Sequence, residues 1–289
     1  DALGTVPTQM TSAYIDEVDR YLSPADVEWV VMGIALMGFL NKFMDAMGIP
    51  LEAEAIHDVA DLIEPTGWTT GKHLWDDTEL DDYHGNGSVP KDSLGTYLRV
   101  LRQAPGALRL ESSWTKGVSG RIGPALMMLE DKVGYAFPIL ATLQHKRAVK
   151  AIASALRENL DPNLTKVGLP AKCMVGLVFA KVVEDEMLMS EMIQLAQLLA
   201  PEIDARLLVD VGKYAVYPAE YAEIPRGLSS REAAAIMLAK AASTSPSNVN
   251  EITVSAVISH LTPAQIVETV VWLSVLQMLH RLYAYYDAR

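Results

Sequence analysis

The sequence predicts an all-α protein built from two related helical halves. Segments with apolar residues at helical spacing cover most of the 289 residues, and convincing alternating strands are absent. One apolar segment also occurs twice. Residues 22–48, LSPADVEWVVMGIALMGFLNKFMDAMG, reappear without a gap as residues 261–287, LTPAQIVETVVWLSVLQMLHRLYAYYD. This internal repeat favours two halves with a common helical plan.

The helical pattern also predicts where each element lies. Ser23 and Thr262 suit the N-cap position, and the prolines that follow them suit the first helical turn. The predicted helices are 8–21, 24–47, 52–63, 91–103, 122–131, 146–159, 170–199, 202–214, 229–243, 249–259 and 263–286.

Two breaks interrupt the helical pattern. Residues 64–91 are rich in Gly, Pro, Asp and Thr and read as a long connection, a kind of segment that is often functional. A second break falls at residues 159–170. We therefore expect an N-terminal half at 1–160, which includes the long connection, and a C-terminal half at 161–289.

Composition and charge exclude some binding partners and indicate a location. The chain is 50% hydrophobic and carries a net charge of −12, which argues against binding to nucleic acid and to anionic membranes. Neither repeat helix reads as a membrane span. The apolar run from Trp29 to Leu40 is shorter than the roughly 20 residues required, and the second helix is interrupted by Ser274 and Gln277. The first residues, DALGTVPTQM, lack the pattern of a signal peptide, so we expect a cytoplasmic protein.

The C-terminal half, from about Leu169 to Asp287, resembles the alkylhydroperoxidase-D-like superfamily, which includes the carboxymuconolactone decarboxylases. The resemblance lies in the order of the segments AKCMVGLVFAKVVEDEMLMSEMIQLAQLLA, LSSREAAAIMLAKAAST and LTPAQIVETVVWLSVLQMLHRLYAYYD. The segment FLNKFMDAMGIPLE of the first half is similar to the family's closing pattern, and GWTTGKHL resembles the segment that follows this pattern in longer members. The resemblance implies a helical fold, a homo-oligomer and a small organic substrate.

The family's peroxidase members carry a Cys-x-x-Cys pair, which this chain lacks. The two thiol positions align with Asp185 and Leu188, and the family's histidine aligns with Met192. Cys173 is the only cysteine, so no mechanism that needs two thiols in one chain applies. The resemblance therefore implies the fold without thiol peroxidase chemistry.

Acidic residues stand where the family keeps its active centre. Glu184, Asp185 and Glu186 fall in the middle of the predicted helix 170–199, and Glu191 follows two turns later. Carboxyl groups in an apolar helix are costly to bury, so we consider Asp185, Glu186 and Glu191 as candidate general acids or bases. The alternative is a solvated helix face.

The second repeat helix supplies the other candidates. His280 occupies the position that matches Asn41 of the first copy, and Arg281 matches Lys42. His280 is a candidate proton carrier, whereas Arg281, Tyr283, Asn41 and Lys42 are candidate substrate-binding residues. The alternative for His280 is a core histidine that donates one hydrogen bond to a neighbouring helix.

The long connection and the helix before it offer further candidates. His73 and Trp75 are aromatic groups that could form a lid over a ligand, or could simply pack on the surface. Glu54 and His57 have the spacing that places a carboxylate and an imidazole on one helix face, as in di-metal helical bundles. One copy of this motif is weak evidence for a metal.

These observations leave three functions open. The first is an enzyme that uses acid–base chemistry on a small organic molecule, such as decarboxylation, isomerisation, elimination or cyclisation. The second is a metal-dependent oxidase or oxygenase, and the third is a non-catalytic relative that binds a ligand or a partner chain. No nucleotide-binding, serine-hydrolase or zinc-protease motif is present, and no cofactor is predicted, although a metal ion remains possible.

Overall fold

The computed structural model describes residues 2–49, 94–201, 203 and 228–289. Within these ranges the chain forms helices and no strands, which confirms the predicted all-α class. Packing groups the chain into two compact units, residues 1–47 with 117–289, and residues 48–116. The predicted boundary at residue 160, between two related halves of the chain, stays a prediction.

The first unit contains nearly all of the described helices. They are α1 (Ser12–Val18), α2 (Pro24–Ala46), α5 (Ile122–Val133), the 3₁₀ helix η4 (Pro138–Thr142), α6 (Lys146–Leu160), α7 (Leu169–Val182), α8 (Glu186–Leu199), α10 (Ser230–Ser243), α11 (Glu251–Ile258) and α12 (Pro263–Ala288). The second unit contributes α4 (Leu94–Trp114), which runs through Pro105. The predicted helices 52–63 and 202–214 lie outside the described residues.

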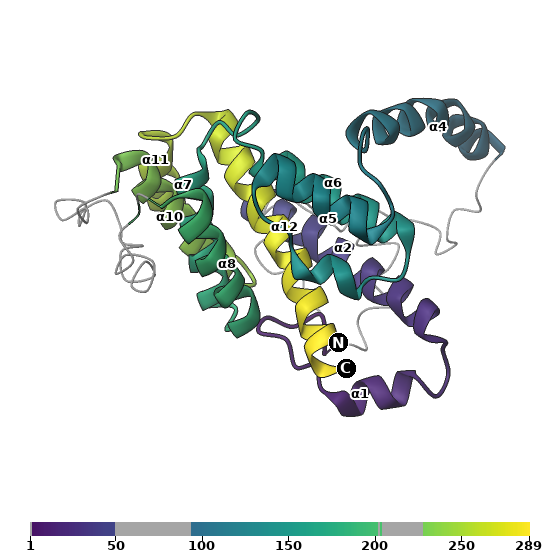
Figure 1. The fold of residues 1–289 in the computed structure, drawn as a ribbon. Coiled ribbons are helices and arrows are strands. Elements are labelled where there is room, and N and C mark those ends of the chain that lie inside the picture. Colours follow the sequence, from purple (N-terminus) through teal and green to yellow (C-terminus); the bar gives the residue numbers. More distant parts are fainter. Residues whose placement is uncertain (1, 50–93, 202, 204–227) are drawn as a thin grey trace, which may run out of the picture. The chain divides into compact units, whose positions relative to one another are not determined.

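The closing helix α12 is the centre of the first unit. It packs against α2, α6, α7, α8 and α10 (Figure 1). Its side chains are buried almost without interruption from Thr269 to Tyr283. Polar residues in this stretch are therefore held inside the core, where each needs a hydrogen-bond partner.

The two copies of the repeated segment lie side by side. Arg281 of α12 reaches the carbonyl oxygen of Ile34 in α2, and Tyr286 reaches Glu28. The contact further along α12 is made with a residue nearer the start of α2, so the two helices run antiparallel. The close approach is possible because Gly38 has no side chain: a Cβ atom there would lie 2.6 Å from the Arg281 guanidinium.

The predicted helix caps are confirmed. The Ser23 side chain accepts a hydrogen bond from the amide of Asp26, and Thr262 forms a reciprocal capping box with Gln265. Helix α2 also fixes the start of α6, because the buried Glu28 carboxylate accepts hydrogen bonds from the amides of Gln144 and His145.

The prediction of one continuous helix over residues 170–199 is wrong. Helix α7 ends at Val182, and Glu184 adopts a left-handed backbone conformation with φ of 58°. The amide of Asp185 then bonds to the Ala180 carbonyl, as in a Schellman motif, and the Asp185 side chain caps α8 by accepting from the Leu188 amide. The acidic residues therefore lie at a helix boundary, where carboxylates suit the N-terminus of the second helix.

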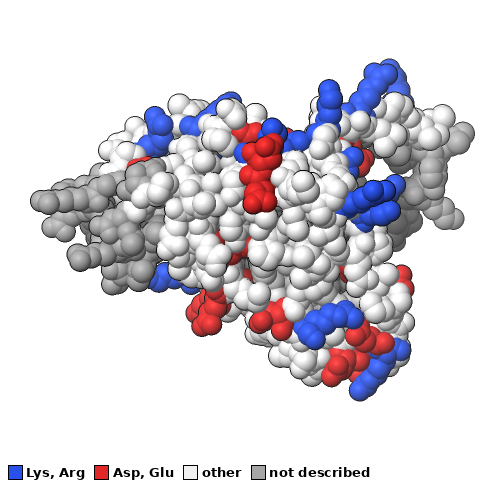
Figure 2. Space-filling model, viewed as in Figure 1, with Lys and Arg blue, Asp and Glu red and all other residues white. Residues whose placement is uncertain are grey.

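One helix in the described part of the chain, α2, is long and apolar enough to cross a membrane by length and composition alone, and 33% of its apolar window is buried in the structure. A core helix passes the same test, and α2 packs along α12. On the face in Figure 2 much of the surface of the first unit is uncharged, and acidic and basic side chains gather around α1.

Candidate functional site

The helix boundary brings Asp185 to His280. The Nδ1 atom of His280 lies 2.7 Å from a carboxylate oxygen of Asp185, and the side chains are 3% and 8% exposed. The other oxygen of Asp185 accepts the Leu188 amide, so the carboxylate cannot turn without losing the helix cap. This pairing orients the imidazole, with Nδ1 toward Asp185 and Nε2 away from it.

A second polar pair lies further along the same two helices. Tyr283 of α12 donates its hydroxyl to a carboxylate oxygen of Glu191 in α8, and both side chains are buried. The hydroxyl of the half-buried Tyr135 lies 3.4 Å from Gln194, an exposed residue of α8. Tyr135 therefore stands between this buried pair and the surface.

Burial dominates the electrostatics of the second pair. It raises the pKa of Glu191 to about 7, whereas the hydrogen bond from Tyr283 lowers this pKa and the charge of Asp185 raises it. Burial, followed by the charge of Glu191, raises the pKa of Tyr135 to about 12. The same two causes raise the pKa of Tyr283, so its hydroxyl keeps its proton.

Several buried polar atoms in this region have no protein partner. They are Nε2 of His280, Oε1 of Glu191 and both amide atoms of Gln277, which lies one turn before His280 in α12 and is 1% exposed. Each such atom loses its interactions with water on folding, which is costly unless another group satisfies it. These atoms are the strongest local sign of a ligand-binding site.

The other sequence candidates on α2 and α12 have structural contacts. Arg281 is 7% exposed and donates to the backbone carbonyls of Ile34 and Gly4. Lys42 donates to the carbonyls of residues 242–244 at the end of α10. Asn41 is exposed. None of these contacts directs the side chain toward His280.

The remaining candidates fall into two groups. Glu186 is exposed at the first turn of α8, whereas Glu191 lies inside. Trp75, His73, Glu54 and His57 lie outside the described residues, so the lid and the metal alternative stay predictions. Within the described ranges, no group of three or more His, Cys, Asp or Glu side chains could hold a metal ion.

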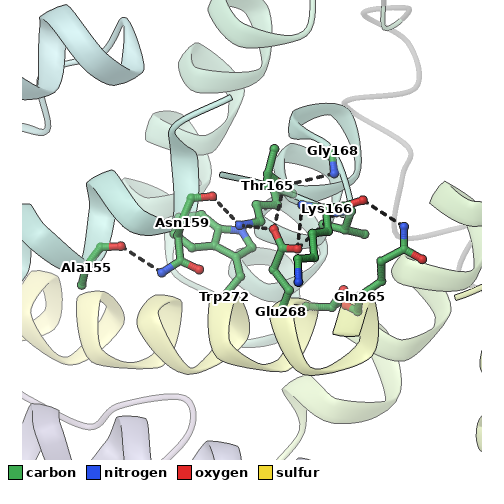
Figure 3. A network of polar contacts seen from close by, with 11 residues as sticks. Ala155, Asn159, Thr165, Lys166, Gly168, Gln265, Glu268 and Trp272 are labelled. Carbon is green, nitrogen blue, oxygen red and sulfur yellow. Dashed lines mark hydrogen bonds and ion pairs between the residues drawn. The ribbon is translucent and has the colours of Figure 1, made fainter. Parts of the chain in front are cut away.

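A separate buried ion pair joins α7 to α12. Lys172 lies 2.8 Å from Glu268, and Glu268 also accepts from the Thr165 hydroxyl and the amide of Lys166 (Figure 3). Burial lowers the pKa of Lys172. Burial alone would raise the pKa of Glu268, but its hydrogen bonds with Lys172 and Thr165 lower it. The Lys172 ammonium also donates to the Asn159 carbonyl. This network holds the connection between α6 and α7 against α12, and it is a structural clamp.

Sequence reasoning missed three buried or half-buried polar features of the structure. The sequence pattern marks Gln277 only as an interruption of an apolar helix. An amide side chain in a helix that is buried on all sides is itself a signal of a buried polar site. Tyr135 follows the left-handed Gly134 that ends α5, and no local pattern connects it with Glu191. The Lys172–Glu268 pair joins residues nearly 100 positions apart, so spacing could not reveal it.

The arrangement is suited to proton transfer. An imidazole whose Nδ1 is held by a carboxylate presents Nε2 as a base, and the carboxylate stabilises the imidazolium that forms. A carboxyl group with a pKa near 7 can give or take a proton at neutral pH. The Asp185–His280 pair and the Glu191–Tyr283 pair thus place two groups of complementary function, one from α12 and one from α8, where these helices pack together.

Comparison with protein-family models, curated proteins and solved structures finds no match. The resemblance to the alkylhydroperoxidase-D-like superfamily therefore stays a prediction from the sequence. The case for function depends on the geometry of the buried polar residues themselves.

Proposed function

We propose that this chain is an enzyme that transfers protons on a small organic molecule, built on an alkylhydroperoxidase-D-like helical fold. The reaction class is decarboxylation, isomerisation, elimination or cyclisation. The observation that supports this proposal is the buried Asp185–His280 pair, with an unpartnered Nε2 atom, beside a Glu191 carboxyl group whose pKa is about 7.

The proposed roles follow from these contacts. His280 takes a proton from the substrate through Nε2, and Asp185 orients the ring and stabilises the imidazolium. Glu191, when protonated, returns a proton to the product through its unpartnered oxygen, and Tyr283 holds that carboxyl group in place. The two groups must act in opposite protonation states, so activity should show a bell-shaped dependence on pH.

The proposal excludes a thiol mechanism of the peroxidase type. Such a mechanism needs an attacking and a resolving thiol, and this chain has one cysteine. That residue, Cys173, is fully buried in α7. A structural cysteine that is buried in this way is inert.

The test is turnover by matched variants. Purified protein is incubated in D₂O with small hydroxy, keto and amino compounds, and exchange or product formation is followed by proton NMR. His280→Asn keeps a donor for Asp185, and introduces the residue found in the first repeat copy, but it removes the base. We expect it to lower turnover about 100-fold or more, as loss of a general base does. Glu191→Gln should have a comparable effect.

The control is the substitution Glu130→Gln on the exposed surface of α5. It changes the same functional group without touching the polar region, and should leave turnover unchanged. Full turnover by His280→Asn would contradict the proposal. Ligand binding without turnover in the wild-type chain would favour the non-catalytic alternative.

A further inference from the structure

One side of α2 is an exposed apolar face. Trp29, Leu36 and Leu40 are 46%, 51% and 42% exposed, and Val30 and Met37 beside them are exposed as well. Every exposed residue of α2 from 29 to 41 is uncharged. A contiguous apolar patch of this kind marks an interaction site. We call this surface the α2 face.

The internal repeat indicates that the α2 face is suited to packing against a helix. Leu36 and Leu40 match Val275 and Leu279 of α12, which are buried. Helices α7, α8 and α10 pack along α12. The same positions are therefore covered in one copy of the repeat and exposed in the other.

The apolar residues of α2 and its two ends are placed symmetrically. Trp29 and Leu40 lie equally far from the midpoint between residues 34 and 35, and the exposed Leu22 and Met47 lie equally far from it at the two ends. Leu22, Trp29 and Leu36 are seven residues apart, as are Leu40 and Met47, which is the spacing of paired helices in coiled coils. In an antiparallel pair of α2 helices about a twofold axis at this midpoint, Trp29 of one copy faces Leu40 of the other.

Charge favours this antiparallel arrangement. Each chain carries a net charge of −12, so two copies meet most easily through an uncharged surface. The exposed Asp26 lies one turn before Trp29. A parallel pair would place the two Asp26 carboxylates side by side, whereas the antiparallel pair separates them by about 25 Å, at 1.5 Å per residue. It also places opposite ends of the two helix dipoles next to each other.

We propose that the α2 face binds a second copy of this chain, through an antiparallel pair of α2 helices about a twofold axis between residues 34 and 35. Helix α2 already packs antiparallel to its repeat copy α12 through its buried side. It thus pairs once within the chain and once between chains. This interface is independent of the chemistry proposed for His280 and Glu191.

Cysteine cross-linking of the full chain tests the orientation and the register. The native Cys173 is fully buried, so the introduced surface thiols are the ones that react. The double variant Trp29→Cys/Leu40→Cys is oxidised mildly and analysed by gel electrophoresis without reductant. We expect a covalent dimer, because each introduced thiol faces the other position of the second copy. Within one chain the two positions are about 16 Å apart along α2, which is too far for a disulfide.

Single variants are the matched controls. Trp29→Cys alone and Leu40→Cys alone should give no covalent dimer, because the two copies of either position also lie about 16 Å apart along the paired helices. Mixing these two single variants before oxidation should restore the cross-link. Met127→Cys, at an exposed position of α5, reports random collision and should give none.

Light scattering coupled to size exclusion measures the assembly of the wild-type chain without any substitution. We expect an even multiple of 31.6 kDa. A mass of one chain would overturn the proposal, and binding of that monomer to phosphatidylcholine vesicles would assign the α2 face to a lipid surface instead. Cross-linking by each single variant alone would indicate a parallel pair. An oligomer whose double variant forms no cross-link would have its interface elsewhere, and both of these results would also overturn the proposal.

Discussion

Glu191 is a buried carboxyl group whose pKa is well above its ordinary value. Its folded pKa is about 7, against 4.5 for the same group in water. Between these values the folded protein holds a proton that the unfolded chain has lost, so the free energy of unfolding falls as pH rises through this window. Glu191→Gln removes the ionisation. The free energy of unfolding of the variant, relative to that of wild type, should therefore increase by about 2–3 kcal/mol between pH 5 and pH 8. Urea unfolding at the two pH values measures this change.

The surface substitution Glu130→Gln serves as the control for this pH dependence, since Glu130 is exposed. Its stability difference from wild type should be the same at both pH values. A Glu191→Gln difference that is also independent of pH would show that Glu191 ionises normally, and would remove the acid from the proposed mechanism.

Asp185 has two contacts, and two substitutions separate them. Asparagine keeps an oxygen for the Leu188 amide, whereas alanine removes both the cap and the partner of His280. Asp185→Ala should lower the free energy of unfolding by about 2 kcal/mol or more, and Asp185→Asn should lower it clearly less. Thermal unfolding measures both changes. Asparagine also donates to Nδ1 and so places the His280 proton on Nε2, which should abolish base catalysis. Equal destabilisation by the two variants would show that the cap is not formed.

The sequence identified much of the polar region residue by residue. Asp185, Glu191, His280 and Tyr283 could be named in advance because polar groups inside apolar helices are costly and therefore conspicuous. The sequence did not predict which of these residues pair with one another. It depends on the boundary at Glu184, where a residue other than glycine adopts the left-handed conformation, so the usual signal for a helix end was missing.

At the level of elements, one glycine of α2 makes room for the Arg281 side chain of α12. A Cβ at Gly38 would lie 2.6 Å from the Arg281 guanidinium, which is held by the Ile34 carbonyl. Gly38→Ala should therefore lower the free energy of unfolding by about 1–3 kcal/mol, as overpacking does. Urea unfolding measures this change.

Gly33, in the same helix, is the matched control. Nothing lies within 4 Å of a Cβ at this position. Gly33→Ala should stabilise the protein by about 0.5–1 kcal/mol through helix propensity alone. If Gly38→Ala were also stabilising, the Arg281 guanidinium would not be held over Gly38 as described.

Helix positions were predictable to the extent that local signals mark them. The starts of α2 and α12 follow from Ser23 and Thr262 with their prolines, and both were located correctly. The direction of Arg281 was not predictable, because it depends on α2 lying beside α12. A local pattern shows that a cation is present, but only tertiary packing decides what it contacts.

At the scale of the whole molecule, α2 leaves an apolar surface uncovered in the first unit. Leu36 and Met37 are 51% and 52% exposed, and the neighbouring residues of this surface are Trp29, Val30 and Leu40. Exposed apolar surfaces of this kind mark interaction sites. The homo-oligomer that the family resemblance implies would give this surface a partner, namely a second copy of the chain.

Light scattering coupled to size exclusion tests the assembly. The wild-type mass should be a multiple of the 31.6 kDa chain, and Leu36→Glu should shift it toward one chain, because a charge in an apolar interface is costly. Met127→Glu, at an exposed position of α5, should leave the mass unchanged. A wild-type mass of one chain would contradict the homo-oligomer.

The fold class was predictable as a whole because helical periodicity covers most of the sequence and the long apolar helices end in clear signals. The relation between the halves, the oligomer and the superfamily stay predictions. Helical periodicity does not predict function, because function depends on a few specific residues. Function is therefore tested by substituting those residues.

The central claim is that a buried acid–base site surrounds His280 and Glu191, and NMR titration of the glutamate side-chain carboxyl carbons tests it most directly. One carboxyl should titrate near pH 7, disappear in Glu191→Gln, and titrate at higher pH in Tyr283→Phe, because the Tyr283 hydrogen bond lowers the pKa. Titration of every glutamate below about pH 5, close to the ordinary value, would contradict the account.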